Sequence, residues 1–470
     1  MVFSSMTFMA FFLPAVMILY FIWDNPKWRN GVLVAFSLLF YAWGEAVRVL
    51  LMVASIFFNY AAAVFITEAK SKRLRRLALI GSLTVTLGML GYFKYFAFFV
   101  NGIGSLFGKG DLVTPEVLPI GISFFTFQIV TYTVDVYLGK TPVQRSVSRL
   151  MLYISFFPQL IAGPIVNYTY IAPQLEQRKT SISGIYRGLN RFCIGLAKKV
   201  LLANVCGEIL RDMPVTGQLS VLGAWLGIVA YALQIYFDFS GYSDMAIGLG
   251  WVFGFRFMEN FNYPYISTSV TEFWRRWHIS LGAFFREYVY IPMGGNRVTV
   301  GRHILNLLVV WGLTGLWHGA SWNFIVWGLY YGGLLILEKF VLKNALEKLP
   351  AFVRWAITML LVLIGWAFFY HIRLADGINH IGAMFGIGAK GLSDPVSVYY
   401  FKRYLGVLAV ACLACLPWKG IVFACAPQGK EKKVNRWVLR IQAVAGIVLL
   451  VLSMAFVVSS SYNPFLYFRF

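Results

Sequence analysis

The chain has 470 residues, of which 59% are hydrophobic, 18% aromatic and only 13% charged. This composition is too apolar for a soluble protein of that length and predicts an all-α, polytopic integral membrane protein. The net charge of +22 would suit nucleic-acid binding, but the basic residues lie in short loops between apolar segments, as the positive-inside rule describes for membrane proteins. We therefore expect no nucleic-acid partner.

Apolar segments that could enter or span a bilayer core of about 30 Å recur from end to end. The first lacks a basic n-region and a small-residue cleavage site, so it is predicted to be the first crossing and not a signal peptide. Because several segments are short or interrupted, we expect about ten to twelve crossings plus re-entrant or interfacial helices, in one domain over residues 1–470. The segments are Phe8–Ile22, Val32–Trp43, Val49–Ile66, Leu77–Val100, Pro119–Leu138, Val221–Phe253, Phe352–Phe369, Tyr404–Pro417 and Val438–Val458.

The basic residues form four main clusters, which are expected to set the topology. If the first two are cytoplasmic, the chain between them is a hairpin and the N-terminus lies outside. Some of this charge could instead meet an anionic cytoplasmic donor such as coenzyme A. The clusters are Lys27 with Arg29, Lys70–Arg76, Arg178 with Lys179, and Lys430–Arg436.

Three interrupted stretches come next in chain order. Leu118–Lys140 carries Ser, Thr, Gln and Asp side chains through an apolar run, which favours hydrogen bonds between helices. Phe156–Val166 contains two prolines and a glycine and predicts a broken helix. In Gln234–Gly250, Asp238 and Asp244 each have a polar neighbour four residues earlier. These acids either satisfy arginine or backbone partners or orient catalytic groups, and we favour the second role.

The stretch Thr271–Trp322 holds the candidate reaction centre. Arg275, Arg276 and His278 lie in a segment whose aromatic residues share one helical face, which predicts an amphipathic interfacial or re-entrant helix. Charged side chains at membrane depth cost at least roughly 2.5 kcal/mol each, so their concentration indicates a site.

The second candidate, His318, follows an apolar run with no charged residue between Leu305 and Glu338. A buried neutral imidazole suits a general base, and His318 is the first-choice catalytic residue. A core histidine bonded to a backbone carbonyl is the alternative.

The five cysteines, Cys193, Cys206, Cys412, Cys415 and Cys425, lie in or beside apolar segments and are interpreted as structural. Cys412 and Cys415 make a lone C-x-x-C, which is a weak metal or redox signal. We predict no metal site and no bound cofactor.

Several long motifs carry a family resemblance. They are FDFSGYSDMAIGLG, ENFNYPY, EFWRRWHISL, FREYVYIPMGGNR and GLWHGASWNFIVWG, and the match runs from MVFSS through GISFFTFQ and FPQLIAGPIV to YNPFLYFRF. Together they resemble the membrane-bound O-acyltransferases, in the branch of the alginate and peptidoglycan O-acetyltransferases. The chain departs from the family pattern at Asn167, Tyr331 and Tyr370, which puts in doubt the partner and the polysaccharide that it serves.

The resemblance implies a helical membrane protein around a central tunnel, in the bacterial cytoplasmic (inner) membrane. It would take an acetyl group from a cytoplasmic thioester, with acetyl-CoA as the expected donor, for an extracytoplasmic polysaccharide of alginate-, cellulose- or peptidoglycan-like kind. An extracytoplasmic SGNH or esterase-like acetyltransferase is the expected partner. The family's invariant histidine falls on His318 and its second histidine on His278. His278 or a neighbouring indole N–H, such as that of Trp317, would polarise the thioester.

Two other classes stay open. A transporter would also use broken helices and buried acids, but no pair of matching halves is visible in the sequence. A D-alanyl transfer protein of teichoic-acid modification shares the RWH and WHG elements, although the SGYSDMAIGLG and IPMGGNR motifs favour the acetyl branch.

Overall fold

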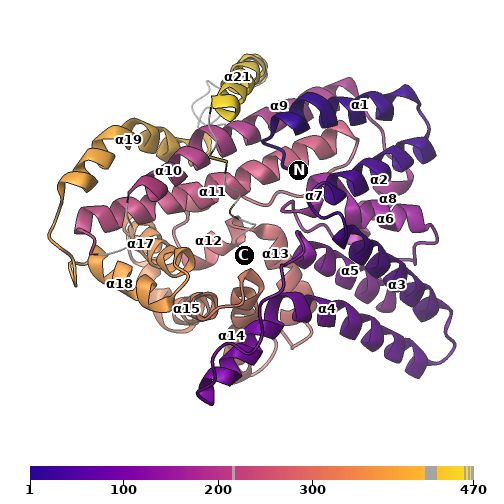
Figure 1. Ribbon diagram of the computed structural model, residues 1–470, viewed down its shortest axis with the longest axis horizontal. Helices are drawn as coiled ribbons and strands as arrows, with labels where there is room; N and C mark the ends of the chain where they lie inside the picture. Colours follow the sequence, from indigo (N-terminus) through magenta and orange to yellow (C-terminus); the bar gives the residue numbers. More distant parts are fainter. Residues whose placement is uncertain (214–217, 419–430, 460–461, 464–465, 467–470) are drawn as a thin grey trace. The chain divides into compact units, whose positions relative to one another are not determined.

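The chain is described by a computed structural model that covers all residues except 214–217, 419–430, 460–461, 464–465 and 467–470. Within this described part, all regular secondary structure is helical and no strand is present (Figure 1). The chain divides into two compact units: unit 1 contains Met1–Phe192 and Asp244–Met258, and unit 2 contains Cys193–Ser243 and Glu259–Phe470. The prediction of an all-α fold is confirmed.

Seven helices among the described residues are long and apolar enough to cross a membrane, so the protein is a multi-pass membrane protein. The predicted ten to twelve crossings would need shorter apolar helices as well, such as Phe8–Ile22, and that number stays a prediction. The seven are Arg48–Glu68, Lys72–Leu106, Val221–Val252, Trp322–Glu347, Ala351–Tyr370, Pro395–Ala414 and Arg440–Ser459.

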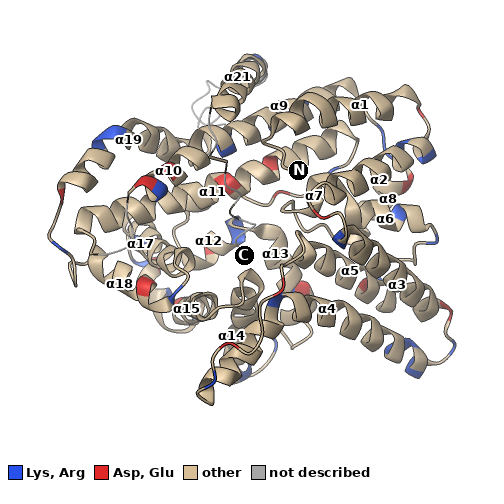
Figure 2. Cartoon of the chain, in the orientation of Figure 1, with Lys and Arg blue, Asp and Glu red and all other residues tan. Residues whose placement is uncertain are grey.

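Unit 1 is built around a group of mutually packed helices, in which α3 contacts α4, α5 and α6, and α2 contacts α6. Figure 2 shows Lys and Arg in blue around the turn between α3 and α4 and mostly tan residues along both helices. The elements of unit 1 are η1 (Phe8–Phe12), α1 (Leu13–Ile22), α2 (Pro26–Ala42), α3 (Arg48–Glu68), α4 (Lys72–Leu106), α5 (Ile122–Tyr137), α6 (Val147–Ser155), α7 (Phe157–Leu160) and α8 (Tyr168–Glu176).

The broken helix predicted at Phe156–Val166 is confirmed. Helix α6 ends at Ser155, Phe156 has an extended ψ of 111°, and the short α7 begins at Phe157. The freed backbone is satisfied inside unit 1, because the Phe157 N–H donates to Ser37 Oγ at 3.1 Å and the Gln159 side chain donates to the Tyr153 carbonyl at 2.5 Å.

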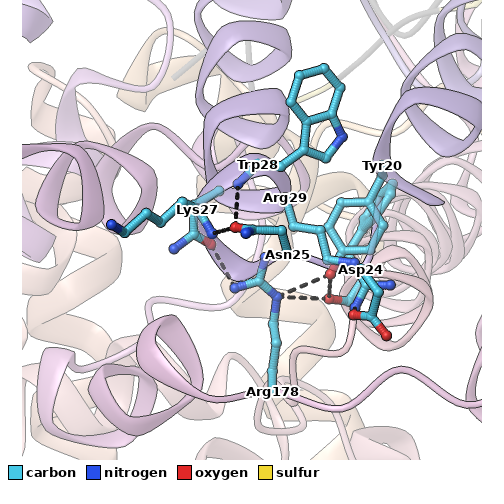
Figure 3. A network of polar contacts seen from close by, with 9 residues as sticks. Tyr20, Asp24, Asn25, Lys27, Trp28, Arg29 and Arg178 are labelled. Atoms are coloured by element: carbon cyan, nitrogen blue, oxygen red, sulfur yellow. Dashed lines mark hydrogen bonds and ion pairs between the residues drawn. The ribbon is translucent and has the colours of Figure 1, made fainter. Parts of the chain in front are cut away.

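Arg178 ties several elements of unit 1 together (Figure 3). Its guanidinium donates to the Tyr20 hydroxyl and the Phe253 carbonyl, both at 3.1 Å, and to Asn30 Oδ1 at 2.6 Å. It also lies 4.4 Å from the centre of the Phe255 ring. A cation predicted from the sequence to set topology therefore holds the start of α2, the end of α1 and the residues after α11 in place.

Unit 2 contains the remaining elements, and helices α9 and α11 run through both units. They are α9 (Ile182–Ala197), η2 (Lys198–Ala203), α10 (Asn204–Asp212), α11 (Val221–Val252), η3 (Pro264–Ile266), α12 (Val270–Arg276), α13 (Ile279–Phe285), η4 (Arg286–Tyr290), α14 (Val300–His318), α15 (Trp322–Leu337), η5 (Glu338–Leu342), α16 (Lys343–Glu347), α17 (Ala351–Tyr370), α18 (Leu374–Met384), α19 (Pro395–Ala414) and α21 (Glu431–Ser459).

Helices α14 and α15 form a tight antiparallel hairpin because two glycines let their backbones touch. A Cβ atom on Gly315 would lie 2.2 Å from the Phe324 carbonyl oxygen, and one on Gly328 would lie 2.3 Å from the Trp311 carbonyl oxygen. No side chain fits at either position without moving the helices apart. Since His318 is the last residue of α14, this crossing sets where its ring lies.

Three π-helical turns in unit 2 carry side chains that become important at the site. They are η2, η4 and η5, each continuous with a neighbouring α-helix. A π turn holds one extra residue and redirects the side chains that follow it, and such turns are frequent at functional sites.

Candidate active site

His318 lies in an aromatic environment at the end of α14, with only 8% of its surface exposed. Its ring centre is 4.9 Å from that of Trp317 and 5.0 Å from those of Trp327 and Phe369, each in an edge-to-face arrangement. Helices α15 and α17 supply the last two rings. The imidazole is therefore held by packing in one orientation.

His318 lines a small cavity of about 20 Å³, which we call the chamber. A cavity of roughly 10–15 Å³ on this measure holds one water molecule, so the chamber has room for about one group of that size. Its other lining residues are Ile235, Asp238, Phe239, Trp277, Trp327, Trp366, Phe369 and Leu466.

Asp238 is the acidic residue of the chamber, and it is held by a buried ion pair. Lys199 Nζ lies 2.6 Å from Asp238 Oδ1, and the two side chains are 4% and 3% exposed. The backbone N–H of Leu466 donates to the other carboxylate oxygen at 2.9 Å. The pair can form because α11 approaches the end of α9 and the start of η2 closely: a Cβ atom on Gly241 would lie 2.7 Å from the Gly195 carbonyl oxygen and 3.1 Å from the Lys199 nitrogen.

His278 lies between two short helices, so the prediction of one continuous amphipathic helix through this segment is wrong. Helix α12 ends at Arg276, α13 begins at Ile279, and His278 has the left-handed angles φ 47° and ψ 52°. Such a backbone is uncommon for a residue other than glycine and is often found at functional sites. Neither glycine nor proline marks the break in the sequence.

Asn260 stabilises the break between α12 and α13 by accepting hydrogen bonds from the first residues of α13. The N–H of Ile279 donates to its carbonyl oxygen at 3.0 Å, and the N–H and hydroxyl of Ser280 donate to Asn260 Oδ1 at 3.1 and 2.9 Å. The Asn260 amide in turn donates to Ser243 Oγ on α11 at 3.3 Å. The first turn of α13 is thus fixed by a fully buried side chain from the loop before α12.

The His278 ring packs against Phe239 and Trp317, with ring centres 4.6 and 5.8 Å apart. Burial lowers the pKa of His278 to about 3, because the charged imidazolium would lose its hydration. His278 is therefore neutral at physiological pH. Trp317, a predicted supporting residue, lies between the two histidines and contacts both rings.

A second cavity, the passage, has a volume of about 180 Å³ and is lined by His278, Trp277, Trp274 and Arg286 among others. Trp277 also lines the chamber, so its indole separates the two cavities. The two histidines thus face adjoining cavities of the same unit.

The passage shares Trp274, Gly282, Arg286, Tyr290 and Leu307 with a third and larger cavity of about 830 Å³, the vestibule. Cationic side chains outnumber carboxylates on its walls, which favours an anionic ligand. The cations are Arg275, Arg286, Lys339, Lys343 and Arg354, and the carboxylates are Glu338 and Glu347.

Side chains of the π turns fix one wall of the vestibule. Glu338 of η5 accepts the backbone N–H groups of Val270 and Thr271 at 2.8 and 3.2 Å, which caps the start of α12. His303 Nε2 lies 2.8 Å from the Tyr290 hydroxyl and 3.4 Å from Lys339 Nζ. An ammonium only donates, so Nε2 is the acceptor and His303 carries its proton on Nδ1.

The other predicted supporting residues are dispersed. Arg275 lines the vestibule, whereas Arg276 is bound to Glu272 at 2.9 Å and to the Asn262 carbonyl at 3.0 Å. Asp244 belongs to unit 1, where Arg191 donates to it at 2.9 and 2.7 Å. Of the two acids on α11, Asp238 lines the chamber with His318, and Asp244 has an arginine partner.

Sequence reasoning missed three residues at the site. The signal for Lys199 is a lysine within an apolar stretch, and the signal for Asn260 is its place inside the motif ENFNYPY. His303 carries no signal of its own in the sequence, since its contacts with Tyr290 and Lys339 depend on the fold.

None of the four cysteines that the structure describes lines any of the three cavities. Cys206 and Cys415 are buried, Cys193 is half-buried and Cys412 is exposed, while Cys425 lies outside the described residues. Within the part of the chain that the structure describes, no group of three or more His, Cys, Asp or Glu side chains is arranged to hold a metal ion.

Comparison with known proteins places this geometry in a family. The model of the membrane-bound O-acyltransferase (MBOAT) family matches residues 143–384, a span that contains both histidines and the walls of the three cavities except Leu466. The chain belongs to this family and is an O-acyltransferase.

Among its relatives, the probable alginate O-acetylase AlgI of Azotobacter vinelandii is 38% identical over 507 residues, with all of both chains covered. The peptidoglycan O-acetyltransferase of Helicobacter pylori is 32% identical, with all of this chain and 98% of the relative covered. The teichoic acid D-alanyltransferase of Bacillus subtilis is 30% identical over 52% of this chain and 65% of its own length.

Proposed function

We propose that this protein takes an acetyl group from acetyl-CoA on the cytoplasmic side of the bacterial inner membrane, for O-acetylation of an extracytoplasmic polysaccharide of alginate-, cellulose- or peptidoglycan-like kind. The observation that supports this function best is the series of three cavities in unit 2: a cationic vestibule, the passage that shares five lining residues with it, and the chamber at His318, which lies across Trp277 from the passage. The names of the relatives that align over the full chain point to the same reaction class.

The vestibule fits the charged part of such a donor. Coenzyme A carries phosphates that cannot enter about 30 Å of hydrocarbon, whereas its pantetheine arm is thin and uncharged. With the phosphates held by Arg275, Arg286 and Lys339, the arm would run through the passage. The thioester would then lie at Trp277, between His278 and His318.

His318 would act as the general base. Its imidazole accepts the proton of the acceptor hydroxyl while the oxygen attacks the thioester carbon, and the C–S bond then breaks as the proton passes to the leaving thiolate. The neutral His278 or the indole N–H of Trp317 would donate to the oxygen that becomes negative. Asp238, held by Lys199 and Leu466, keeps the chamber wall beside His318 in place.

The acceptor would be reached through a partner. We propose an extracytoplasmic SGNH or esterase-like acetyltransferase that receives the acetyl group and delivers it to the polysaccharide. Such a partner would explain how a transfer site at His318, which is only 8% exposed, serves a polymer that cannot reach it.

A histidine replacement tests the proposal. His318→Ala should lower polymer-bound acetate at least 100-fold, since general bases contribute about 10²- to 10⁴-fold to rate. His380→Gln is the matched control: His380 is another buried histidine of unit 2, and its Nε2 donates to the Ala224 carbonyl at 3.0 Å. Normal polymer acetate in His318→Ala at a normal membrane protein level would refute the assignment.

Sidedness is tested with purified protein in sealed vesicles. Acetyl-CoA should be consumed only when it is presented on the face that bears the basic loops, and equal consumption from either face would rule out a one-way route. A strict need for an acyl carrier protein as donor would favour the D-alanyl class instead.

A further inference from the structure

The small size of the chamber limits what can lie beside His318. When the pantetheine arm lies in the passage and the thioester carbon lies at Trp277, which lines both cavities, the acyl chain extends into the chamber. The volume of about 20 Å³ is enough for one water-sized group. A methyl group is about that size, so an acetyl group fits and one further methylene has no room.

The walls that set this volume are rigid. Trp327 and Trp366 are both 1% exposed, and their rings are 6.4 Å apart in a stacked arrangement. Trp366 also lies 4.9 Å from Trp277 and 5.6 Å from Phe369. Four rings that pack on each other and on the surrounding helices cannot move aside independently, because interiors packed at this density transmit any displacement to their neighbours.

Ile235 closes the chamber on the side of α11. It is 6% exposed and belongs to the same buried core as the four rings. Its aliphatic side chain can be shortened without removing a hydrogen bond.

We infer that the chamber restricts the transferred group to two carbons, with Ile235 and Trp366 as the residues that determine this specificity. The inference rests on the proposed function, since it presumes that the thioester carbon reaches Trp277. The relatives' names describe acetyl and D-alanyl transfer but assign no residue to the choice of acyl group. The aromatic wall is therefore a selectivity filter, distinct from the histidines that perform the transfer.

The test compares acetyl-, propionyl- and butyryl-CoA as donors for the full-length protein in lipid nanodiscs, with release of the free thiol as the readout. The wild-type kcat/KM should fall at least about 10-fold for each added methylene, the lower end of what one methylene contributes in a fitted pocket. Ile235→Ala should raise the propionyl-to-acetyl ratio by about 10-fold or more. Trp366→Phe should raise it in the same direction and serves if the first variant does not fold.

Ile228→Ala is the matched control. Ile228 lies two helical turns before Ile235 on α11 and is 0% exposed in the same core, but it does not line the chamber. Its replacement creates a comparable cavity elsewhere, so the propionyl-to-acetyl ratio should stay at the wild-type value. An equal shift in Ile228→Ala would show that general loosening is responsible and would overturn the inference.

The remaining outcomes are also decisive. A wild-type protein that uses butyryl-CoA as well as acetyl-CoA contradicts the filter, as do Ile235→Ala and Trp366→Phe proteins that keep the wild-type ratio while they turn over acetyl-CoA. If no thioester releases thiol in the presence of the acceptor partner, the proposed function itself fails. Turnover without length preference leaves the proposed function standing and rejects only the filter.

Discussion

Replacing Lys199 by Met should strongly destabilise the protein. The ammonium of Lys199 lies 2.6 Å from Asp238, and less than one twentieth of either side chain is exposed. Without it, the carboxylate would keep the Leu466 N–H as a donor but would lose its countercharge in a buried site. The loss in free energy of unfolding should be about 3–5 kcal/mol, the usual result of removing one partner from a buried ion pair.

The double variant Lys199→Met/Asp238→Leu should recover most of this loss. Two apolar side chains of similar volume remove both charges, and such replacements are often neutral or stabilising. The coupling energy between the two positions should therefore be about 3 kcal/mol or more. Acetyl transfer should stay low in the double variant, because Asp238 lines the chamber with His318.

An exposed ion pair with the same separation provides a control that isolates the effect of burial. Arg145 and Glu68 are also 2.6 Å apart, but their side chains are 62% and 58% exposed. Arg145→Met should change the free energy of unfolding by no more than about 1 kcal/mol. The free energy of unfolding of each variant is measured by denaturant titration in mixed micelles. Equal losses for Lys199→Met and for the double variant would refute the argument from an uncompensated buried charge.

The remaining predictions concern other parts of the site. Asparagine tolerates a left-handed backbone, so His278→Asn should unfold near the wild-type midpoint, whereas His278→Val should lose about 1–3 kcal/mol in free energy of unfolding. Equal midpoints for the two variants would argue against backbone strain at this position. Because burial holds the pKa of His278 near 3, the imidazole stays neutral above pH 5, and its contribution to stability is lost only as the pH falls below about 6.5. The pH–rate profile of His278→Asn between about pH 5 and 8 should therefore keep the wild-type shape, and a shifted acid limb would count against a neutral His278. Arg286→Gln should raise KM for acetyl-CoA about 10-fold at unchanged kcat and weaken the dependence of this KM on salt. Arg276→Gln should change neither, because the Arg276 guanidinium is already paired with Glu272. A full salt dependence in Arg286→Gln would show that Arg286 does not bind the donor. Gly328→Ala should destabilise the α14–α15 hairpin and lower acetyl transfer, because its Cβ would lie 2.3 Å from a carbonyl oxygen, and wild-type activity would show that the crossing does not position His318.

The apolar central parts of the helices were predictable from hydropathy, but the residues at which the helices begin were less so. The run predicted from Tyr404 belongs to α19, which begins nine residues earlier at Pro395. Its start is set by Asp394, whose carboxylate accepts the N–H groups of Val396 and Ser397 at 3.1 Å. Lys402 and Arg403 hide this first part from a search for apolar segments, so capping and not hydropathy decides the boundary.

The two histidines of the candidate site were predictable from the sequence, but their surroundings and their arrangement were not. His278 and His318 could be selected because polar groups in apolar segments are rare. The left-handed backbone of His278 could not, since it depends on Asn260, which lies 18 residues earlier and bonds to the first turn of α13. The partner of Asp238 was equally hidden: Lys199 comes 39 residues earlier in the chain, and only the packing of η2 on α11 brings them together.

The π turns have a consequence for how relatives of this chain can vary in length. Each turn differs from regular α-helix by one inserted residue, so deleting a single residue from Arg286–Tyr290 would restore an ordinary helix and rotate everything after it by about 100°. That rotation would carry Tyr290 away from His303 and so rearrange the wall of the vestibule that these two residues line. Single-residue gaps within η4 or η5 in an alignment of homologues should therefore mark lineages that changed their donor, whereas gaps in the surrounding loops should carry no such meaning.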